Sequence, residues 1–355
     1  MEKKVSGKHS SMNGFAMMKG RVATVVLASA LLLGGGLTAQ AQNAALTTCS
    51  QSAATAIPQN PNWKANAAEW QKLKGEITLY MTNDMGRNGY YDQKPIAELM
   101  GRMAEENDFE AVLALGDVHH FMGVESVTDP LWMTNYELMY SHPELQIPWY
   151  PILGNHEYRG NTQAVLDYSK VSRRWQMPAR YYSKVFADDS TSLRIVFLDT
   201  TPLIDKYHQD TEDYPSVRKQ KIQKQLAWLE KELAQAKEDW VVVVGPQPIY
   251  ADTSKDTVER ADMQRRGDTI LRRHHVNMYI CGHIHNFQHF HFPDSPIDYV
   301  VNSAASLSRE KVSTMEGTQF VSGEPGFSIL TCTKNMLKLD LINGKGNVIH
   351  SITQR

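Results

Sequence analysis

Four short apolar runs in this 355-residue chain each end beside a glycine and a cluster of aspartate, asparagine or histidine. The clusters are D-M-G at 84–86, G-D-V-H-H at 116–120, G-N-H-E at 154–157 and G-H-I-H at 282–285. An isolated Gly-Asp or Gly-Asn pair is typical of a turn, because Asp and Asn tolerate left-handed backbone conformations. Four such clusters, each behind an apolar run, indicate a shared metal site instead. Their oxygen and nitrogen donors suit first-row metals such as iron, zinc or manganese.

The last cluster adds an argument from spacing. His283 and His285 are two residues apart and directly follow the apolar run 277–281. Side chains at positions i and i+2 of an extended strand point to the same side. We therefore expect both imidazoles to face one site.

The residues around these clusters predict alternating strands and helices. Apolar runs predict short strands at 77–81, 111–115, 148–153, 194–198, 240–244 and 277–281. Periodicity predicts helices at 95–106, 217–236 and 258–273, with only strand-like runs after residue 297. This alternation favours a layered α/β fold. Because the carboxyl ends of strands in such folds gather at one edge, where ligands bind, the four clusters are expected to meet there.

The composition excludes several classes of protein. With 42% hydrophobic and 21% charged residues, the chain is neither collagen-like nor low-complexity. The formal net charge of −2 gives no strongly basic face that would indicate nucleic acid as a partner. The three cysteines lack metal-site spacing, and G-x-S-x-G, P-loop and G-x-G-x-x-G motifs are absent. A protein built around a metal site remains the favoured class.

The N-terminus has the pattern of a secretory signal. Five basic residues precede the apolar run 22–37, which ends at the A-x-A site formed by residues 39–41. A run of 16 residues with three glycines is short for a membrane span. Cleavage would take the formal net charge from −2 to −6. We expect a signal peptide at 1–41, a leader at 42–74 and a single domain at 75–355, in a secreted or periplasmic protein without a membrane span.

The chain resembles the calcineurin-like metallophosphoesterases, and among them the small purple acid phosphatases of the tartrate-resistant type. The resemblance covers residues 75–345 and is carried by the ordered clusters and by PWYPILGNHEYRGN, YSKVSRRWQMPARYY and MYICGHIHNFQ. It implies a four-layer αββα sandwich with two mixed sheets flanked by helices. It also implies hydrolysis of phosphate monoesters by a metal-activated hydroxide at two divalent or trivalent ions, iron, zinc or manganese. A small phosphorylated substrate and a monomeric chain are expected.

The resemblance also implies roles for individual residues. Transferred position by position, the metal ligands would be Asp84, Asp117, His120, Asn155, His283 and His285. Asp117 would bridge the two ions, the first ion taking Asp84, His120 and His285 in addition. The second ion would take Asn155 and His283. The catalytic residues would be Asp117 and His156, the latter beside the leaving group.

Two positions depart from the family pattern. His120 stands where the family has a tyrosine ligand, and Pro246 stands where the family has a histidine ligand of the second metal. A proline side chain offers no donor atom, so the second site is expected to be weak. Gln247, His119 and His208 are nearby residues that would have to substitute for the missing ligand.

Two alternatives to a phosphomonoesterase stay open. A phosphodiesterase or nucleotidase would use the same fold and the same ligands, because specificity in such sites lies in the loops. A weakened or inactive chain that only binds phosphate or metal would follow from the loss of the histidine at position 246.

Overall fold

The computed structural model describes residues 63–255 and 257–355. The predicted signal peptide and residues 42–62 of the predicted leader lie outside the described residues. The strands are β1 (Ile77–Thr82), β2 (Ala111–Ala114), β3 (Trp149–Pro151), β4 (Tyr182–Ala187), β5 (Ser192–Phe197), β6 (Trp240–Val244), β7 (Met278–Cys281), β8 (Phe287–His291), β9 (Asp298–Val301), β10 (Thr318–Ser322), β11 (Gly326–Thr333), β12 (Met336–Asn343) and β13 (Val348–Gln354). The α-helices are α2 (Trp63–Trp70), α3 (Gln93–Ala104), α4 (Thr162–Asp167), α5 (Asp205–Gln209), α6 (Ile222–Ala234), α7 (Val258–Met263) and α8 (Thr269–Leu271).

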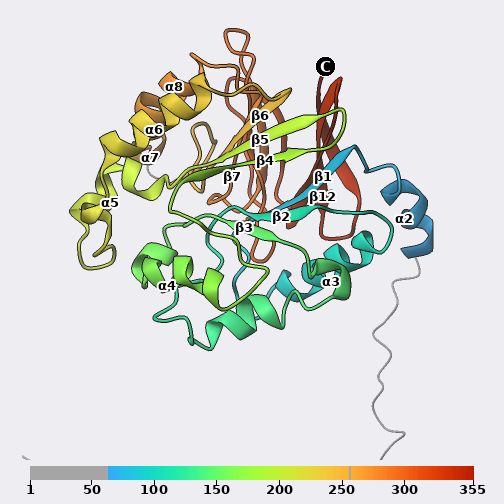
Figure 1. Cartoon of the computed structure of the whole chain (residues 1–355), viewed down its shortest axis with the longest axis horizontal. Helices are drawn as coiled ribbons and strands as arrows, with labels where there is room; N and C mark the ends of the chain where they lie inside the picture. Colours follow the sequence, from blue (N-terminus) through green and yellow to red (C-terminus); the bar gives the residue numbers. More distant parts are fainter. Residues whose placement is uncertain (1–62, 256) are drawn as a thin grey trace, which may run out of the picture. The chain divides into compact units, whose positions relative to one another are not determined.

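These strands form two mixed sheets. The six-stranded sheet has the order β13-β12-β11-β1-β2-β3, and the seven-stranded sheet has the order β10-β8-β9-β7-β6-β5-β4. The strands β1, β2 and β3 run parallel, as do β5, β6, β7 and β9. Helices α3 and α4 lie on the outer side of the first sheet, and α6, α7 and α8 lie on the outer side of the second (Figure 1). The predicted fold class, an αββα sandwich, is confirmed.

The central strands are buried on both faces. All six residues of β1 and all five of β6 are buried, which explains why both have continuous apolar runs rather than alternating patterns. Parallel strands of this kind end at a common edge of their sheet. The loops that follow β1, β2, β3 and β7 carry the four polar clusters.

A buried amide pair ties the two sheets together at this edge. Asn83 follows β1 in one sheet and Asn302 follows β9 in the other. The Asn83 side chain donates to the carbonyl of Asn302 at 3.0 Å, and the Asn302 side chain donates to the carbonyl of Met81 at 3.0 Å. Because unpaired buried amides are costly, this exchange fixes the position of the loop that begins at Asp84.

Most predicted elements are present, with differences in two helices and three strands. The helix predicted from 217 begins only at Ile222, because residues 217–219 form a 3₁₀ turn and Lys221 is extended. The helix predicted for 258–273 is interrupted by a π-helical turn at Gln264–Asp268. Strands β4, β8 and β10 are not predicted by the sequence, since their mixed polar and apolar residues lack a continuous apolar run.

The predicted leader reaches into the packed structure at its end. Trp70 in α2 is buried, and its indole N–H donates to the carbonyl of Gly346 at 2.8 Å. The side chain of Asn107 in turn donates to the carbonyl of Trp70. Within the described part of the chain, no helix is long and apolar enough to cross a membrane.

Candidate metal centre

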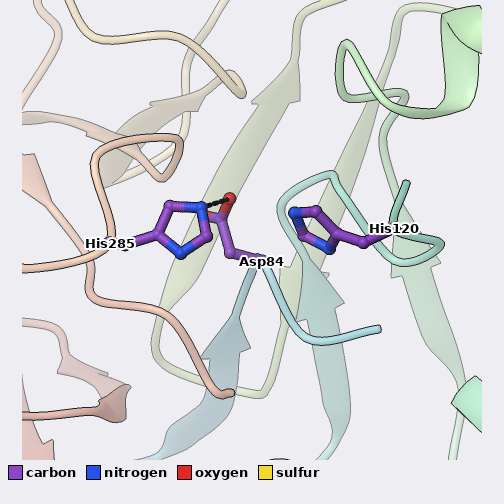
Figure 2. A group of neighbouring side chains, drawn as sticks. All are labelled: Asp84, His120 and His285. Carbon is purple, nitrogen blue, oxygen red and sulfur yellow. Dashed lines mark ion pairs between the residues drawn. The ribbon is translucent and has the colours of Figure 1, made fainter. Parts of the chain in front are cut away.

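Asp84 is held in one orientation by its neighbours. It follows β1 with a positive φ of 50°. Its Oδ2 accepts hydrogen bonds from the Asn83 side chain at 2.6 Å and from the main-chain N–H of His283 at 2.7 Å. Its Oδ1 lies 3.1 Å from Nε2 of His285 (Figure 2). Although burial opposes it, the charge and hydrogen bond of His285 hold the pKa of Asp84 below its usual value.

Asp117 is held through a buried glutamate. Its main-chain N–H donates to Glu157, and the same carboxylate accepts the main-chain N–H groups of His119 and Gly154. Glu157 therefore joins the loop after β2 to the loop after β3. The Asp117 carboxylate accepts the main-chain N–H of His156 at 3.0 Å. Burial and the nearby Asp84 carboxylate raise the pKa of Asp117 to about 7, which means that a cation between the two would be stabilising.

His120 lies where the ligand atoms of both loops converge. Ligand atoms of Asp84, His120 and His285 all lie within 4.8 Å of one another, and so do those of Asp117, His120 and His156. Figure 2 shows the Asp84 side chain between the rings of His285 and His120. The structure therefore brings five of the predicted site residues together.

Several buried polar atoms at this place have no hydrogen-bond partner among the described residues. They are both ring nitrogens of His120 and Oδ1 of Asn155, while Oδ1 of Asp84 meets only the ring of His285. Most buried polar side-chain atoms in folded proteins are paired, because an unpaired one costs about 1–3 kcal/mol. Carboxylate, amide and imidazole atoms that converge without partners fit a bound metal ion.

His156 presents one defined ring nitrogen to the cleft. Its Nδ1 lies 2.7 Å from the carbonyl oxygen of Phe121, so that Nδ1 carries the proton of this hydrogen bond. Its ring centroid is 4.2 Å from that of His120. Nε2 is then the atom left to meet a bound ligand.

His283 differs from its neighbour His285. Its Nε2 lies 2.9 Å from the Glu259 carboxylate, which also accepts the hydroxyl of Tyr207 at 2.6 Å and pairs with Lys206 at 2.5 Å. The sequence argument assumed that both histidines lie on one extended strand, and that assumption is wrong. Strand β7 ends at Cys281, and both histidines have positive φ, 71° and 66°, so strand alternation does not apply.

The residue types that follow β6 leave the second site incomplete. Pro246 packs against the loop at Gly116, where a Cβ added to the glycine would stand 3.2 Å from the proline Cβ. Gln247 is buried, and its amide pairs with the hydroxyls of Thr200 and Thr201. This amide is therefore not free to replace the missing histidine.

Neither of the two nearby histidines replaces it. The ring of His119 packs on Trp132, with centroids 4.4 Å apart, and its Nδ1 pairs with Asn135. Its Nε2 has no partner among the described residues, but His119 does not line the cleft. Nε2 of His208 lies 2.8 Å from the carbonyl of Pro202. None of the substitutes considered from the sequence supplies a ligand in this structure.

The cleft in front of these residues has a volume of about 850 Å³ and contains basic side chains that the sequence did not single out. It is lined by Asp117, Asn155, His156, His283 and His285, and also by Arg87, Lys255 and Arg309. Arg87 is 8% exposed, and its Nε and Nη1 have no partner among the described residues. The only signal in the sequence was its place directly after D-M-G, which a surface arginine shares.

Comparisons with known proteins agree with this architecture. Residues 77–287 match the family model of the calcineurin-like phosphoesterases. The chain is 31% identical over 286 residues to purple acid phosphatase 4 of Arabidopsis thaliana, covering 78% of this chain and 83% of that protein. It is 33% identical over 216 residues to tartrate-resistant acid phosphatase type 5 of Oryctolagus cuniculus, covering 59% and 66%.

Solved structures show the same fold. GAP50, described as the anchor in the inner membrane complex of Plasmodium, superposes with a TM-score of 0.66 at 23% identity, covering 78% of this chain and 87% of that one. Purple acid phosphatase PPD1 of yellow lupin superposes with a TM-score of 0.56 at 15% identity, covering 79% and 54%.

Proposed function

The chain belongs to the calcineurin-like phosphoesterase family of hydrolases, and from this premise we propose that it is a metal-dependent phosphatase that hydrolyses phosphate monoesters. The observation that carries the proposal is the convergence of the ligand atoms of Asp84, His120 and His285, where both ring nitrogens of His120 are buried without a partner among the described residues. The named relatives, which are acid phosphatases, support the same reaction.

The residues that would hold a metal ion are Asp84, Asp117, His120 and His285. An ion bound there would lower the pKa of a coordinated water and neutralise charge on the phosphoryl group. Iron, zinc and manganese all accept this mixture of carboxylate and imidazole. Asn155 and His283 were expected to complete a second ion site. Oδ1 of Asn155 has no partner among the described residues, whereas His283 is engaged by Glu259, so the pairing speaks against His283 alone.

The chain's own groups would orient the substrate and manage the leaving group. The Phe121 carbonyl holds the Nδ1–H of His156, so Nε2 would face the ester oxygen that departs. Because Nδ1 holds the proton of the neutral ring, Nε2 would donate only from the doubly protonated imidazole, and burial lowers the pKa of His156 to about 4. In that form, favoured at acid pH, a proton or hydrogen bond from Nε2 to the leaving oxygen would stabilise the charge that develops there. Glu157 would keep the loops of Asp117 and His156 in register through its three main-chain hydrogen bonds.

The test is turnover of para-nitrophenyl phosphate across pH, combined with metal analysis of the same preparation. We expect hydrolysis that is lost on chelation and restored by added iron, zinc or manganese. The diester bis(para-nitrophenyl) phosphate and a nucleoside monophosphate serve as comparison substrates. Faster turnover of either would favour a phosphodiesterase or a nucleotidase over the phosphomonoesterase.

A chain that binds phosphate without hydrolysing it is the second candidate function. Pro246 and the engaged Gln247 favour it, because the second site lacks one imidazole and no neighbour among the described residues replaces it. Phosphate binding without turnover at any metal concentration would be its signature. We also propose export, on the basis of the signal pattern at 1–41, which a fractionation experiment would test.

A further inference from the structure

We propose that basic side chains, Lys255 and Arg87 with Arg309 at the rim, take the place of the second metal ion and bind the phosphoryl oxygens of the substrate. The proposal rests on the proposed function in one respect, since it takes the anion to be the phosphoryl group of a substrate. It assigns a role to three residues outside the expected ligand set.

The residues on this side of the cleft do not fit a second metal ion. Nε2 of His283 is 2.9 Å from Glu259, and that carboxylate is also held by Tyr207 and Lys206. Pro246 offers no donor atom. A metal ion would have to take this imidazole from Glu259, which is outside the expected ligand set, and breaking such a buried pair is unfavourable. The pair of His285 with Asp84 is different, because one ion could contact both of its members.

Lys255 places a positive charge in this region. It follows β6 in an irregular segment before α7, and its ammonium group donates a hydrogen bond to the carbonyl oxygen of His283. Burial lowers its pKa, while the charges of Asp84, Glu259 and Asp117 act to raise it. The ammonium thus lies near the carboxylates of both loops, and one hydrogen bond leaves further N–H groups for a ligand.

Arg87 supplies a second, independent observation. The residue is only 8% exposed, lines the cleft, and has two guanidinium nitrogens without a partner among the described residues. The guanidinium stacks on the ring of Phe121 at 4.5 Å, which fixes its plane. A planar donor of this kind binds two oxygens of one phosphoryl group.

The remaining charges of the cleft have partners or are exposed to solvent. Arg309 is anchored by its main-chain N–H, which donates to the carbonyl of His285 at 2.6 Å. Glu259 is paired with Lys206 and His283. Asp210 and Asp213 also line the cleft, but both are exposed, so solvent screens them.

Ammonium and guanidinium groups bind phosphoryl oxygens but do not activate water. One metal ion at Asp84, His120 and His285 would therefore have to activate the water alone, and the basic side chains would bind the phosphoryl oxygens. The proposal predicts one metal ion per chain and measurable phosphate affinity without any metal.

The experiment measures metal stoichiometry and phosphate binding separately on the full chain. Chelator-treated protein is titrated with Mn²⁺ and, in a second series, with inorganic phosphate by calorimetry. We expect one Mn²⁺ per chain, and a loss of phosphate affinity of about tenfold or more in Lys255→Met and in Arg87→Met, the size of one lost charged hydrogen bond. Lys311→Met is the matched control, because Lys311 is exposed and does not line the cleft.

Lys255→Met is the decisive variant. Lys255 lies in an irregular segment, so its replacement is less prone to disturb the fold than that of Arg87, which is packed on Phe121. Arg87→Lys keeps the charge without the planar donor and should fall between wild type and Arg87→Met. Two Mn²⁺ ions bound with similar affinity in the wild type would overturn the proposal, as would unchanged phosphate affinity in Lys255→Met. Lys255-dependent phosphate binding in a protein that hydrolyses nothing would refute the proposed function and support this inference, while hydrolysis with two bound ions would do the reverse.

Discussion

The two halves of the cleft use polar residues at the ends of similar strands, yet they differ in what those residues are free to do. On the side of β1 and β2, both ring nitrogens of His120 are buried without a hydrogen-bond partner among the described residues, and Asp84 pairs with another candidate ligand, His285. On the side of β6 and β7, the corresponding groups are occupied, His283 by Glu259 and Gln247 by Thr200 and Thr201. The difference indicates that a ligand-type residue at this edge is a candidate metal ligand when its donor atom is unpaired or is paired only with another candidate ligand.

We call the side of β1 and β2 the open half of the cleft and the side of β6 and β7 the occupied half. The largest loss of metal binding and turnover is expected from a substitution in the open half. Asp117→Ala should abolish metal binding and reduce turnover by about 10³-fold or more, because the charge that holds the ion and fixes the reacting groups is lost. The measurement is metal content together with turnover of para-nitrophenyl phosphate. Asp213→Asn, at an exposed position of the same cleft, is the control and should keep both. Retention of metal and activity in Asp117→Ala would show that the open half is not the metal site.

His156→Asn tests the leaving-group role of the same half. We expect a loss of turnover of about 10²–10⁴-fold for an alkyl phosphate, the usual range for a general acid. The loss should be much smaller for 2,4-dinitrophenyl phosphate, whose leaving oxygen needs no proton. Metal content should stay unchanged. An equal loss for both substrates would contradict the assignment of Nε2 to the leaving oxygen.

The occupied half is tested by adding an imidazole at position 246 and by removing the carboxylate that pairs with His283. Pro246→His alone restores an imidazole but leaves His283 bound to Glu259, so we expect little gain in affinity for a second Mn²⁺ ion. Pro246→His combined with Glu259→Gln frees His283 and should raise that affinity by about tenfold or more, the range seen when groups that contact metal ligands change. Titration of both variants is the measurement. A full gain from Pro246→His alone would mean that the pairing with Glu259 is not what closes this half.

Asp199 is a buried carboxylate outside both halves of the cleft, and its substitution should have the smallest effect on the metal site. It tests whether an unpaired buried oxygen is by itself a sign of a metal ligand. Oδ1 of Asp199 also lacks a partner among the described residues, while its Oδ2 accepts the hydroxyl of Tyr158, and burial raises its pKa to about 7. Its protonated form is therefore favoured in the folded chain. The free energy of unfolding should fall as pH rises from about 4 towards and above 7, by up to about 4 kcal/mol.

Asp199→Asn should remove that part of the pH dependence and leave metal content unchanged. Thermal unfolding at pH 5 and pH 8 measures it, with the variant losing less stability between the two than the wild type. A change in metal content would show that Asp199 contributes to the metal centre. An unchanged pH dependence would mean that Asp199 is already ionised in the folded chain.

The strands and the open half of the site were predictable from the sequence for a physical reason. Continuous apolar runs such as 77–81 and 240–244 are buried on both faces and so carry a strong local signal. Asp84, Asp117 and His120 each follow such a run at the edge where parallel strands end, which allowed their convergence to be predicted. Strands with mixed composition, such as β8, gave no local signal and were missed.

The sequence by itself determined the family and the fold class and supplied the candidate donor residues, because these depend on residue type and order along the chain. Only the tertiary structure decided which donors are free. The partner of His283 is Glu259, 24 residues away, and its hydrogen bond depends on how α7 packs beside β7. Arg87 and Lys255 likewise enter one cleft from different sheets, and their unpaired or shared hydrogen bonds exist only in the folded chain.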